Sequence, residues 1–285
     1  MLIIIGAIIV LACVTGGYIL SHGVLMALWQ PFELLIICGA ALGAFVSANP
    51  PKVHKAVFKN IIGVLKGSKY KKELYLELLS LIYDLLQKSR KEGLMAIEED
   101  IDDPSNSNVF TAYPKVSSDH HVMDFICDYF RLMVGGNMNP FELENLMDIE
   151  LATHHQEAEM PAEAVTKVAD ALPGFGIVAA VLGIVITMSF IGGDPALIGG
   201  HVAAALVGTF LGILIAYGFV SPLAVAMEHA ARDEAKFFEC IKVCILASVN
   251  GYSPQIAVEF GRKVMYSSDR PSFSELEDHV KGSKT

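Results

Sequence analysis

The apolar stretches of this chain contain very few side chains that could take part in chemistry. Thr209 is the one conspicuous hydroxyl in the middle of such a stretch, Tyr217 follows it, and His201 lies nearer one end. Carboxylates and lysines usually carry ions across a membrane, and none lies in the middle of any long apolar stretch. We therefore expect that the membrane part cannot move ions by itself.

Thr209 alone does not decide between packing and ion transport. A lone threonine in a helix usually donates a hydrogen bond to the carbonyl four residues earlier, which satisfies its hydroxyl inside its own helix. A hydroxyl that faces a partner could instead orient water or a carboxylic acid. Both interpretations of Thr209 remain open at this point.

The chain lacks the sequence motifs of common enzymes. It has no G-x-x-x-x-G-K-[ST] phosphate loop, no G-x-S-x-G turn and no H-E-x-x-H metal motif. The chain has two pairs of adjacent histidines, which begin at His120 and His154. The two side chains of each pair point to different faces of a helix and cannot bind one metal ion together. Cys240 and Cys244 are four residues apart and do not form a C-x-x-C pair. We therefore predict no enzyme activity, no metal site and no cofactor.

Four long apolar stretches define the membrane part. A helix that crosses a membrane needs roughly 17–25 apolar residues. The chain is 53% hydrophobic with a mean hydropathy of +0.48, and its first charged residue is Glu33. The simplest interpretation is four transmembrane helices, two on each side of a long polar segment: Met1–Leu20, Leu34–Asn49, Ala171–Gly193 and Pro195–Met227.

The distribution of basic residues predicts the orientation of these helices. The connection Ser21–Pro31 has no Lys or Arg, and the connection near Gly192–Gly200 has only Asp194 as a charged residue. Seven lysines follow the second stretch: Lys52, Lys55, Lys59, Lys66, Lys69, Lys71 and Lys72. Since basic residues favour the cytoplasmic side, we expect the polar segment and both termini in the cytoplasm.

This topology divides the chain into four parts. Residues 1–50 hold transmembrane helices 1 and 2, residues 51–170 a cytoplasmic helical domain, residues 171–227 transmembrane helices 3 and 4, and residues 228–285 cytoplasmic C-terminal helices. Most of the formal net charge of −10 comes from the cytoplasmic parts. Such an acidic surface does not suit nucleic acid, but it could meet a basic protein face.

The polar parts show helical periodicity, so the predicted fold class is an all-α membrane protein. Apolar residues recur at spacings of three and four along Lys71–Lys91. Asp100–Pro114 is rich in loop residues and should be a break. Asn139 is placed to cap a helix that runs through Leu143–Lys167 toward the third span, and Glu228–Val249 should extend the fourth span.

Small residues and two prolines mark the third and fourth spans. Small residues allow membrane helices to approach closely. The close approach can be between the third and fourth spans or between them and a helix of another chain. Pro173 and Pro222 mark helix boundaries or kinks, or act as hinges that pass a change at membrane depth to the cytoplasmic helices. The small residues are Gly176, Ala179, Ala180 and Gly183 in the third span and Ala204, Gly208, Gly212 and Ala216 in the fourth.

At these residues the chain resembles the MotA/PomA family of flagellar motor stator subunits, which is distantly related to ExbB and TolQ. The resemblance covers essentially the whole chain. Its most specific runs are Leu172–Ala180, Val207–Leu214, Ala216–Pro222, Asn250–Lys263 and Tyr266–Phe273.

The resemblance implies a partner-dependent machine in the bacterial inner membrane. Family members form a homopentamer around the helices of two MotB-type subunits, whose aspartate binds the permeating ion. The ring turns and pushes the rotor protein FliG. The resemblance implies that Pro173 and Pro222 couple the ion step to motion, that Thr209 faces the partner aspartate, and that Arg90 and Glu98 face the rotor. On physical grounds alone, a solvated helix end is the favoured interpretation of Arg90 and Glu98.

The same resemblance bears on the permeant ion. Sodium-type relatives have a threonine where this chain has Ala180, and a Thr-Thr pair where it has Gly208-Thr209. Neither Ala180 nor Gly208 has a side-chain oxygen for a cation. We therefore expect that the permeant ion is the proton rather than sodium. Thr209 and Tyr217 are then the remaining polar groups of the ion pathway, beside Ala180.

Two other functions remain open from the sequence. One is an ExbB- or TolQ-like energiser of outer-membrane processes with a different single-span partner. The other is a self-sufficient ion transporter, which would need its own polar relay at membrane depth, and only Thr209, Tyr217 and His201 are available for it.

Overall fold

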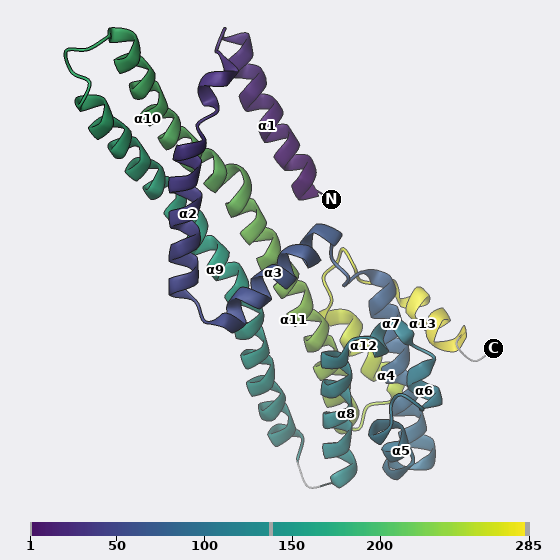
Figure 1. Cartoon of the computed structure of the whole chain (residues 1–285). Coiled ribbons are helices and arrows are strands. Elements are labelled where there is room, and N and C mark those ends of the chain that lie inside the picture. Colours follow the sequence, from purple (N-terminus) through teal and green to yellow (C-terminus); the bar gives the residue numbers. More distant parts are fainter. Residues whose placement is uncertain (1, 137–138, 283–285) are drawn as a thin grey trace. The chain divides into compact units, whose positions relative to one another are not determined.

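Helices make up all the regular structure in the part of the chain that is described. The structure is a computed structural model that describes residues 2–136 and 139–282, and no strand occurs within those ranges (Figure 1). The predicted all-α fold is therefore confirmed. Two compact units can be distinguished: Met1–Gly67 with Glu157–Ala231, and Ser68–Gln156 with Arg232–Thr285.

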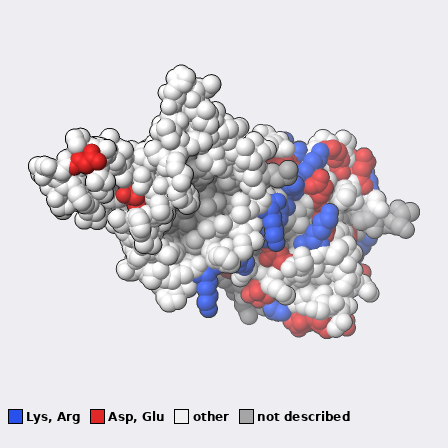
Figure 2. Space-filling view, turned by 45° about the horizontal axis from the view of Figure 1, so that its top comes forward, with Lys and Arg blue, Asp and Glu red and all other residues white. Residues whose placement is uncertain are grey.

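Four helices of the described chain are long and apolar enough to cross a membrane, as predicted. They are α1 (Leu2–Leu20), α2 (Pro31–Ala48), α9 (Pro140–Met188) and α10 (Pro195–Ile215). Large apolar side chains cover their outer faces, and no residue of α1 is buried. Figure 2 shows a large surface with almost no Lys, Arg, Asp or Glu, while the charged residues gather elsewhere on the same view. Such a surface suits lipid. Of α9, only the part after Asp170 is free of charged residues.

The second span begins earlier than the sequence indicated. A short 3-10 turn, η1 (Leu25–Leu28), precedes α2, which starts at Pro31 and therefore includes Glu33 in its first turn. Proline favours the first turn of a helix because its fixed φ is already helical and its missing N–H would have no partner there. The apolar run that begins at Leu34 therefore identified the apolar part of α2 correctly. It did not predict that the helix itself starts at Pro31.

Helix α9 is continuous from the polar segment into the third span, as predicted. Its start is a capping box: the Asn139 side-chain oxygen accepts from the Glu142 N–H at 2.9 Å, and the Glu142 carboxylate accepts from the Asn139 N–H at 3.1 Å. Pro161 and Pro173 lie inside this helix. Pro173 is therefore not a helix boundary, because helical backbone extends on both sides of it.

The fourth span also continues as a helix, but with a change of type that the sequence did not predict. A π-helical segment, η3 (Ala216–Val220), joins α10 to α11 (Ser221–Val249). The Ser221 N–H donates to the Ala216 carbonyl, five residues earlier. Pro222 comes directly after this segment. A proline ring would clash with the carbonyl four residues before it in a regular helix, and the wider π turn relieves that clash.

Helix α3 (Pro51–Lys66) completes the first unit. Its Val53 and Val57 are buried with Ala162 and Val165 of α9 and with Met227 of α11. A second cluster joins α2 to the spans through the buried residues Ile37, Ala41, Leu172, Ala179 and Ala216. The first unit is thus held together by small and medium apolar side chains.

The second unit has a single large apolar core. It is built from α4 (Lys72–Glu92), α8 (His120–Gly135), α12 (Pro254–Val264), α13 (Phe273–Gly282) and the second half of α11. The predicted stripe of α4 lies inside this core, and the largest fully buried side chains include Tyr129, Phe110, Phe130 and Phe237. Periodicity thus identified the buried faces correctly.

The expected break at Asp100–Pro114 is more ordered than predicted. Short helical turns lie in and around it: η2 (Leu94–Ile97), α5 (Glu98–Asp102), α6 (Asn108–Thr111) and α7 (Pro114–Ser117). Asp100, only 7% exposed, accepts from Lys88 at 2.6 Å and from the Ser107 hydroxyl at 2.7 Å. The predicted break is present at residues 103–107, between α5 and α6. The short helices around it were not predicted, because their network depends on residues distant in sequence.

A buried arginine fixes the C-terminal helices. Arg262 is 7% exposed, donates two hydrogen bonds to the Glu259 carboxylate and a third, of 2.9 Å, to the Pro271 carbonyl. These bonds tie α12 to the segment that leads into α13. The hydrogen bonds and charge of Arg262 hold the pKa of the Glu259 carboxyl below its ordinary value of 4.5.

This pair predicts a pH dependence of stability. Because the folded-state pKa of Glu259 is lowered, its contribution is fully present above pH 4.5 and is lost as the pH falls through the folded value. Glu259→Gln should therefore flatten the loss of thermal stability on acidification below about pH 5. Glu277→Gln, which breaks the exposed Glu277–Lys281 pair, is the matched control. The measurement is the melting temperature of the purified chain as a function of pH. If the melting temperatures of wild type and Glu259→Gln fall equally on acidification, the stabilising role of the Glu259–Arg262 pair is contradicted.

Candidate ion pathway and coupling elements

Helices α9 and α10 approach each other at their glycines. A Cβ on Gly212 would lie 2.8 Å from the Leu172 carbonyl oxygen and 2.9 Å from the Gly176 Cα. A Cβ on Gly176 would lie 3.1 Å from the Gly208 carbonyl oxygen and 3.4 Å from the Thr209 Cα. The two backbones therefore touch, and no side chain could be added at these points without moving a helix.

The contact continues along both helices. A Cβ on Gly183 would lie 2.9 Å from the Ala205 Cβ, and one on Gly208 would lie 3.3 Å from the Ala179 Cβ. Packing within the chain thus accounts for these small residues, which was one of the two interpretations left open by the sequence. The spacing of these residues is therefore not additional evidence that they bind a helix of another chain.

Thr209 differs from the other described threonines. Each of those donates to the carbonyl four residues earlier, at 2.6–3.0 Å: Thr15, Thr111, Thr153, Thr166 and Thr187. Thr209 is half-buried, and its hydroxyl makes no hydrogen bond within the described residues. The usual way to satisfy a lone helix threonine does not apply, so its hydroxyl is available to water or to another chain.

Ala180 lies at the same level as Thr209. The Ala180 nitrogen is 3.6 Å from the position of a Cβ on Gly208, the residue before Thr209. The α9–α10 contact thus brings together Ala180 and Gly208-Thr209, and the only side-chain oxygen among these three residues is the Thr209 hydroxyl.

The other three membrane positions lie nearer the junction with α11. Tyr217 is in the π segment and 62% exposed, and Pro222 is exposed just beyond it. Pro173 is half-buried and follows Leu172, whose carbonyl makes the closest approach to Gly212. Tyr217 follows Thr209 by eight residues, about 12 Å along a helix at about 1.5 Å per residue. Both prolines lie beside a special feature of the backbone.

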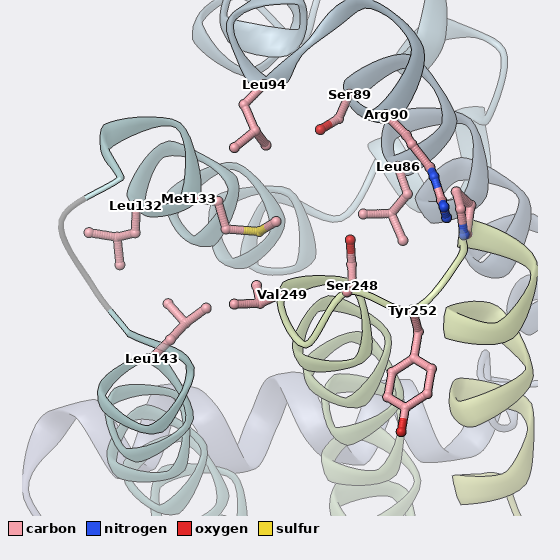
Figure 3. A pocket seen from close by; sticks show the side chains of 12 residues that line it. Leu86, Ser89, Arg90, Leu94, Leu132, Met133, Leu143, Ser248, Val249 and Tyr252 are labelled. Carbon is pink, nitrogen blue, oxygen red and sulfur yellow. The ribbon is translucent and has the colours of Figure 1, made fainter.

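Arg90 and Glu98 both belong to the second unit and are both exposed. Arg90 is in the last turn of α4, where a positive charge suits the helix dipole, and Glu98 is the first residue of α5. The Lys88–Asp100 pair connects the two elements that carry them. Arg90 also borders a cavity of about 420 Å³, together with Leu86, Leu94 and Tyr252 (Figure 3).

Sequence reasoning missed Glu33. Its Cγ is 3.5 Å from the position of a Cβ on Gly208, and its Oε2 is enclosed without a hydrogen-bond partner. This carboxylate therefore packs at the α9–α10 contact, although its position before the apolar run suggested a helix end. The one sequence signal was the neighbouring Pro31, which can start a helix early.

The comparisons with known proteins agree with this structure. Residues 4–93 match the family model "Motility protein A N-terminal", and residues 118–239 match "MotA/TolQ/ExbB proton channel family". Motility protein A of Salmonella typhimurium is 49% identical over 99% of this chain and 95% of its own length. That of Escherichia coli K12 is 49% identical over 100% and 96%. Chemotaxis protein LafT of Vibrio parahaemolyticus is 42% identical over 95% of each chain.

Two solved structures share the fold. The structure of C. jejuni MotAB matches with a TM-score of 0.77 at 20% identity, and covers 95% of this chain and 98% of its own. The flagellar MotAB stator complex from Bacillus subtilis matches with a TM-score of 0.71 at 24% identity, and covers 96% and 97%.

Fold and site define the class: a multi-pass, all-helical membrane protein in which two spans touch through glycines and continue as helices beyond the membrane part. The chain belongs to the motility protein A branch of the MotA/TolQ/ExbB proton channel family. Its place among ion channels that act as flagellar stators confirms the prediction that it is not an enzyme, and it implies the inner membrane.

The α9–α10 contact predicts a specific sensitivity to size. Gly212→Ala should force the two helices apart and lower the stability of the assembled protein by about 1–3 kcal/mol, as overpacking does. Gly43→Ala in α2 is the matched control, because a Cβ there meets nothing within 4 Å. Melting temperatures in detergent would test this. Equal melting temperatures of the two variants would contradict the close approach at Gly212.

Proposed function

We propose that this chain is the membrane subunit of a flagellar stator, which forms a proton channel with a MotB-type partner and converts proton flow into torque on the rotor protein FliG. The observation that carries the proposal is the combination at Gly208-Thr209: a touching pair of helices, one unbonded hydroxyl, and no charged residue in α10 or in the apolar part of α9. Such a site can orient an ion carrier. The one carboxyl beside it, that of Glu33, belongs to α2, and in this proposal the MotB-type partner supplies the carboxylate that binds the ion.

The assembly we propose is a homopentamer around two partner chains. Its support is the MotAB composition named for the two solved structures and the apolar, unburied surfaces of α1 and of the apolar part of α9. Residues 1–50 and 171–227 lie in the membrane, residues 51–170 and 228–285 lie in the cytoplasm, and both termini are cytoplasmic. The lysines that follow α2 support this orientation.

Pro173 and Pro222 are the coupling points in this proposal. Pro173 follows the carbonyl that makes the closest contact with α10, and Pro222 follows the π segment. Both are places where the regular hydrogen-bond ladder of the helix is interrupted. A change in charge on the partner near Thr209 would bend the helices most easily at these points.

Arg90 and Glu98 are the rotor-facing charges. Their contacts with the rotor are solvent-exposed, so each is worth about 0–1 kcal/mol. Neutralising either one should weaken swimming modestly, and Arg90→Glu should do more harm because it replaces attraction by repulsion. Reversal of the complementary charge on FliG should partly restore swimming in soft agar.

The control for Arg90 is Lys91→Glu, which reverses an exposed charge in the same helical turn. It should impair swimming less than Arg90→Glu does. Proton flux through the Arg90→Glu complex should remain normal. A loss of flux equal to the loss of torque would assign Arg90 to folding or conduction instead.

The permeant ion is the proton. Ala180 and Gly208 supply no side-chain oxygen, and Thr209 supplies one, whereas a sodium ion that sheds its water needs several oxygen ligands. Swimming speed should therefore be independent of external sodium at fixed pH and should collapse with a protonophore. Speed that follows sodium concentration and survives the protonophore would overturn proton coupling.

A further inference from the structure

Glu33 lies at membrane depth, although it is only the third residue of α2. Helix α2 packs against α10, and Glu33 reaches Gly208, which lies about 20 Å along α10 from Pro195 at about 1.5 Å per residue. The hydrocarbon core of a bilayer is about 30 Å thick. The contact between Glu33 and Gly208 is therefore well inside the membrane part.

Glu33 is an unusual group for this environment. Its Oε2 is enclosed and has no hydrogen-bond partner, while the residue as a whole is half-buried. A carboxyl oxygen removed from water without a donor carries a free-energy cost, and the cost is larger when the group is ionised. Glutamine or leucine would fill the same space. An intramembrane carboxyl that is retained against this cost indicates a functional role.

The surroundings of Glu33 contain no competing carboxyl. The apolar part of α9 has no titratable residue, α10 has only His201, whose ring stacks on Phe190 at 5.0 Å between centroids, and α2 otherwise has only the thiol of Cys38. Glu33 is thus the only acidic group of α2, α10 and the apolar part of α9. Gly208 leaves no side chain between this carboxyl and the α10 backbone beside Thr209.

We propose that Glu33 is a proton-transfer group of the channel. Its carboxylate takes one proton from water on the outer side, and the resulting carboxylic acid releases it through water at Gly208 and Thr209 toward the carboxylate that the partner supplies. Only O–H bonds form and break, and Glu33 returns to its starting state with each proton. This inference rests on the proposed proton-channel function, and it assigns the chain a chemical step beyond orienting its partner.

The test compares Glu33→Gln, Glu33→Asp and Asp194→Asn in the complete complex with the MotB-type partner. Glutamine keeps the size and loses the exchangeable acid, and aspartate keeps the acid. Asp194 caps α10 by accepting from the Ala196 N–H at 2.9 Å and lies outside the contact, so it is the matched control. Proton conductance of membrane vesicles and swimming speed are measured from external pH 5.5 to 8.5.

Glu33→Gln should lower conductance at least roughly tenfold, since a positioned proton-transfer group commonly contributes more than that. The loss should be largest at high pH, where protons are scarce. Glu33→Asp should conduct at an intermediate rate with a displaced pH profile, and Asp194→Asn should match wild type. Each variant is also checked for co-purification with the partner.

Two results would overturn the inference. One is an assembled Glu33→Gln complex with wild-type conductance and pH profile. The other is failure of both Glu33→Gln and Glu33→Asp to assemble, which would assign the side chain to packing. A wild-type complex that conducts no protons would instead overturn the proposed function itself, so the two failures are distinguishable.

Discussion

The first unit depends on the contact between the backbones of α9 and α10. Lipid tails are as apolar as leucine, so burial of apolar surface does not drive membrane helices together, and close van der Waals packing must do so. Glycines at positions 176, 208 and 212 allow that packing. The cluster of Ile37, Ala41, Leu172, Ala179 and Ala216 then attaches α2 and the π segment to the same pair of helices.

This constraint also explains why the chain offers so little chemistry of its own. A surface built for backbone contact has no room for large polar side chains, so the hydroxyl of Thr209 and the carboxyl of Glu33 are placed beside the contact. In the function proposed above, the chain positions an ion carrier through these few groups. The partner supplies the rest of the chemistry.

Much of this architecture could be predicted from the sequence because it is local. Apolar length identified the spans, periodicity identified the buried stripe of α4, and Asn139 identified the start of α9. The depth of Glu33 could not be predicted, because it depends on where the η1 turn and Pro31 place α2 against α10. The Lys88–Asp100–Ser107 network was missed for the same reason: its members meet only in the fold. The glycine spacing was recognised, but it could not distinguish contact within the chain from contact with another chain.

The π segment has a consequence for the register of the helix that follows it. One residue more than an α-helix needs is accommodated between Ala216 and Val220, so every later residue is turned by about 100° from where uninterrupted α-helix would place it. Ala224 and Met227 reach the cluster around Val53 and Val165 only with that extra residue. Deleting one residue here would leave composition and apolar length almost unchanged, yet it would turn this whole face away. In this stretch the number of residues is therefore as strictly constrained as their identity.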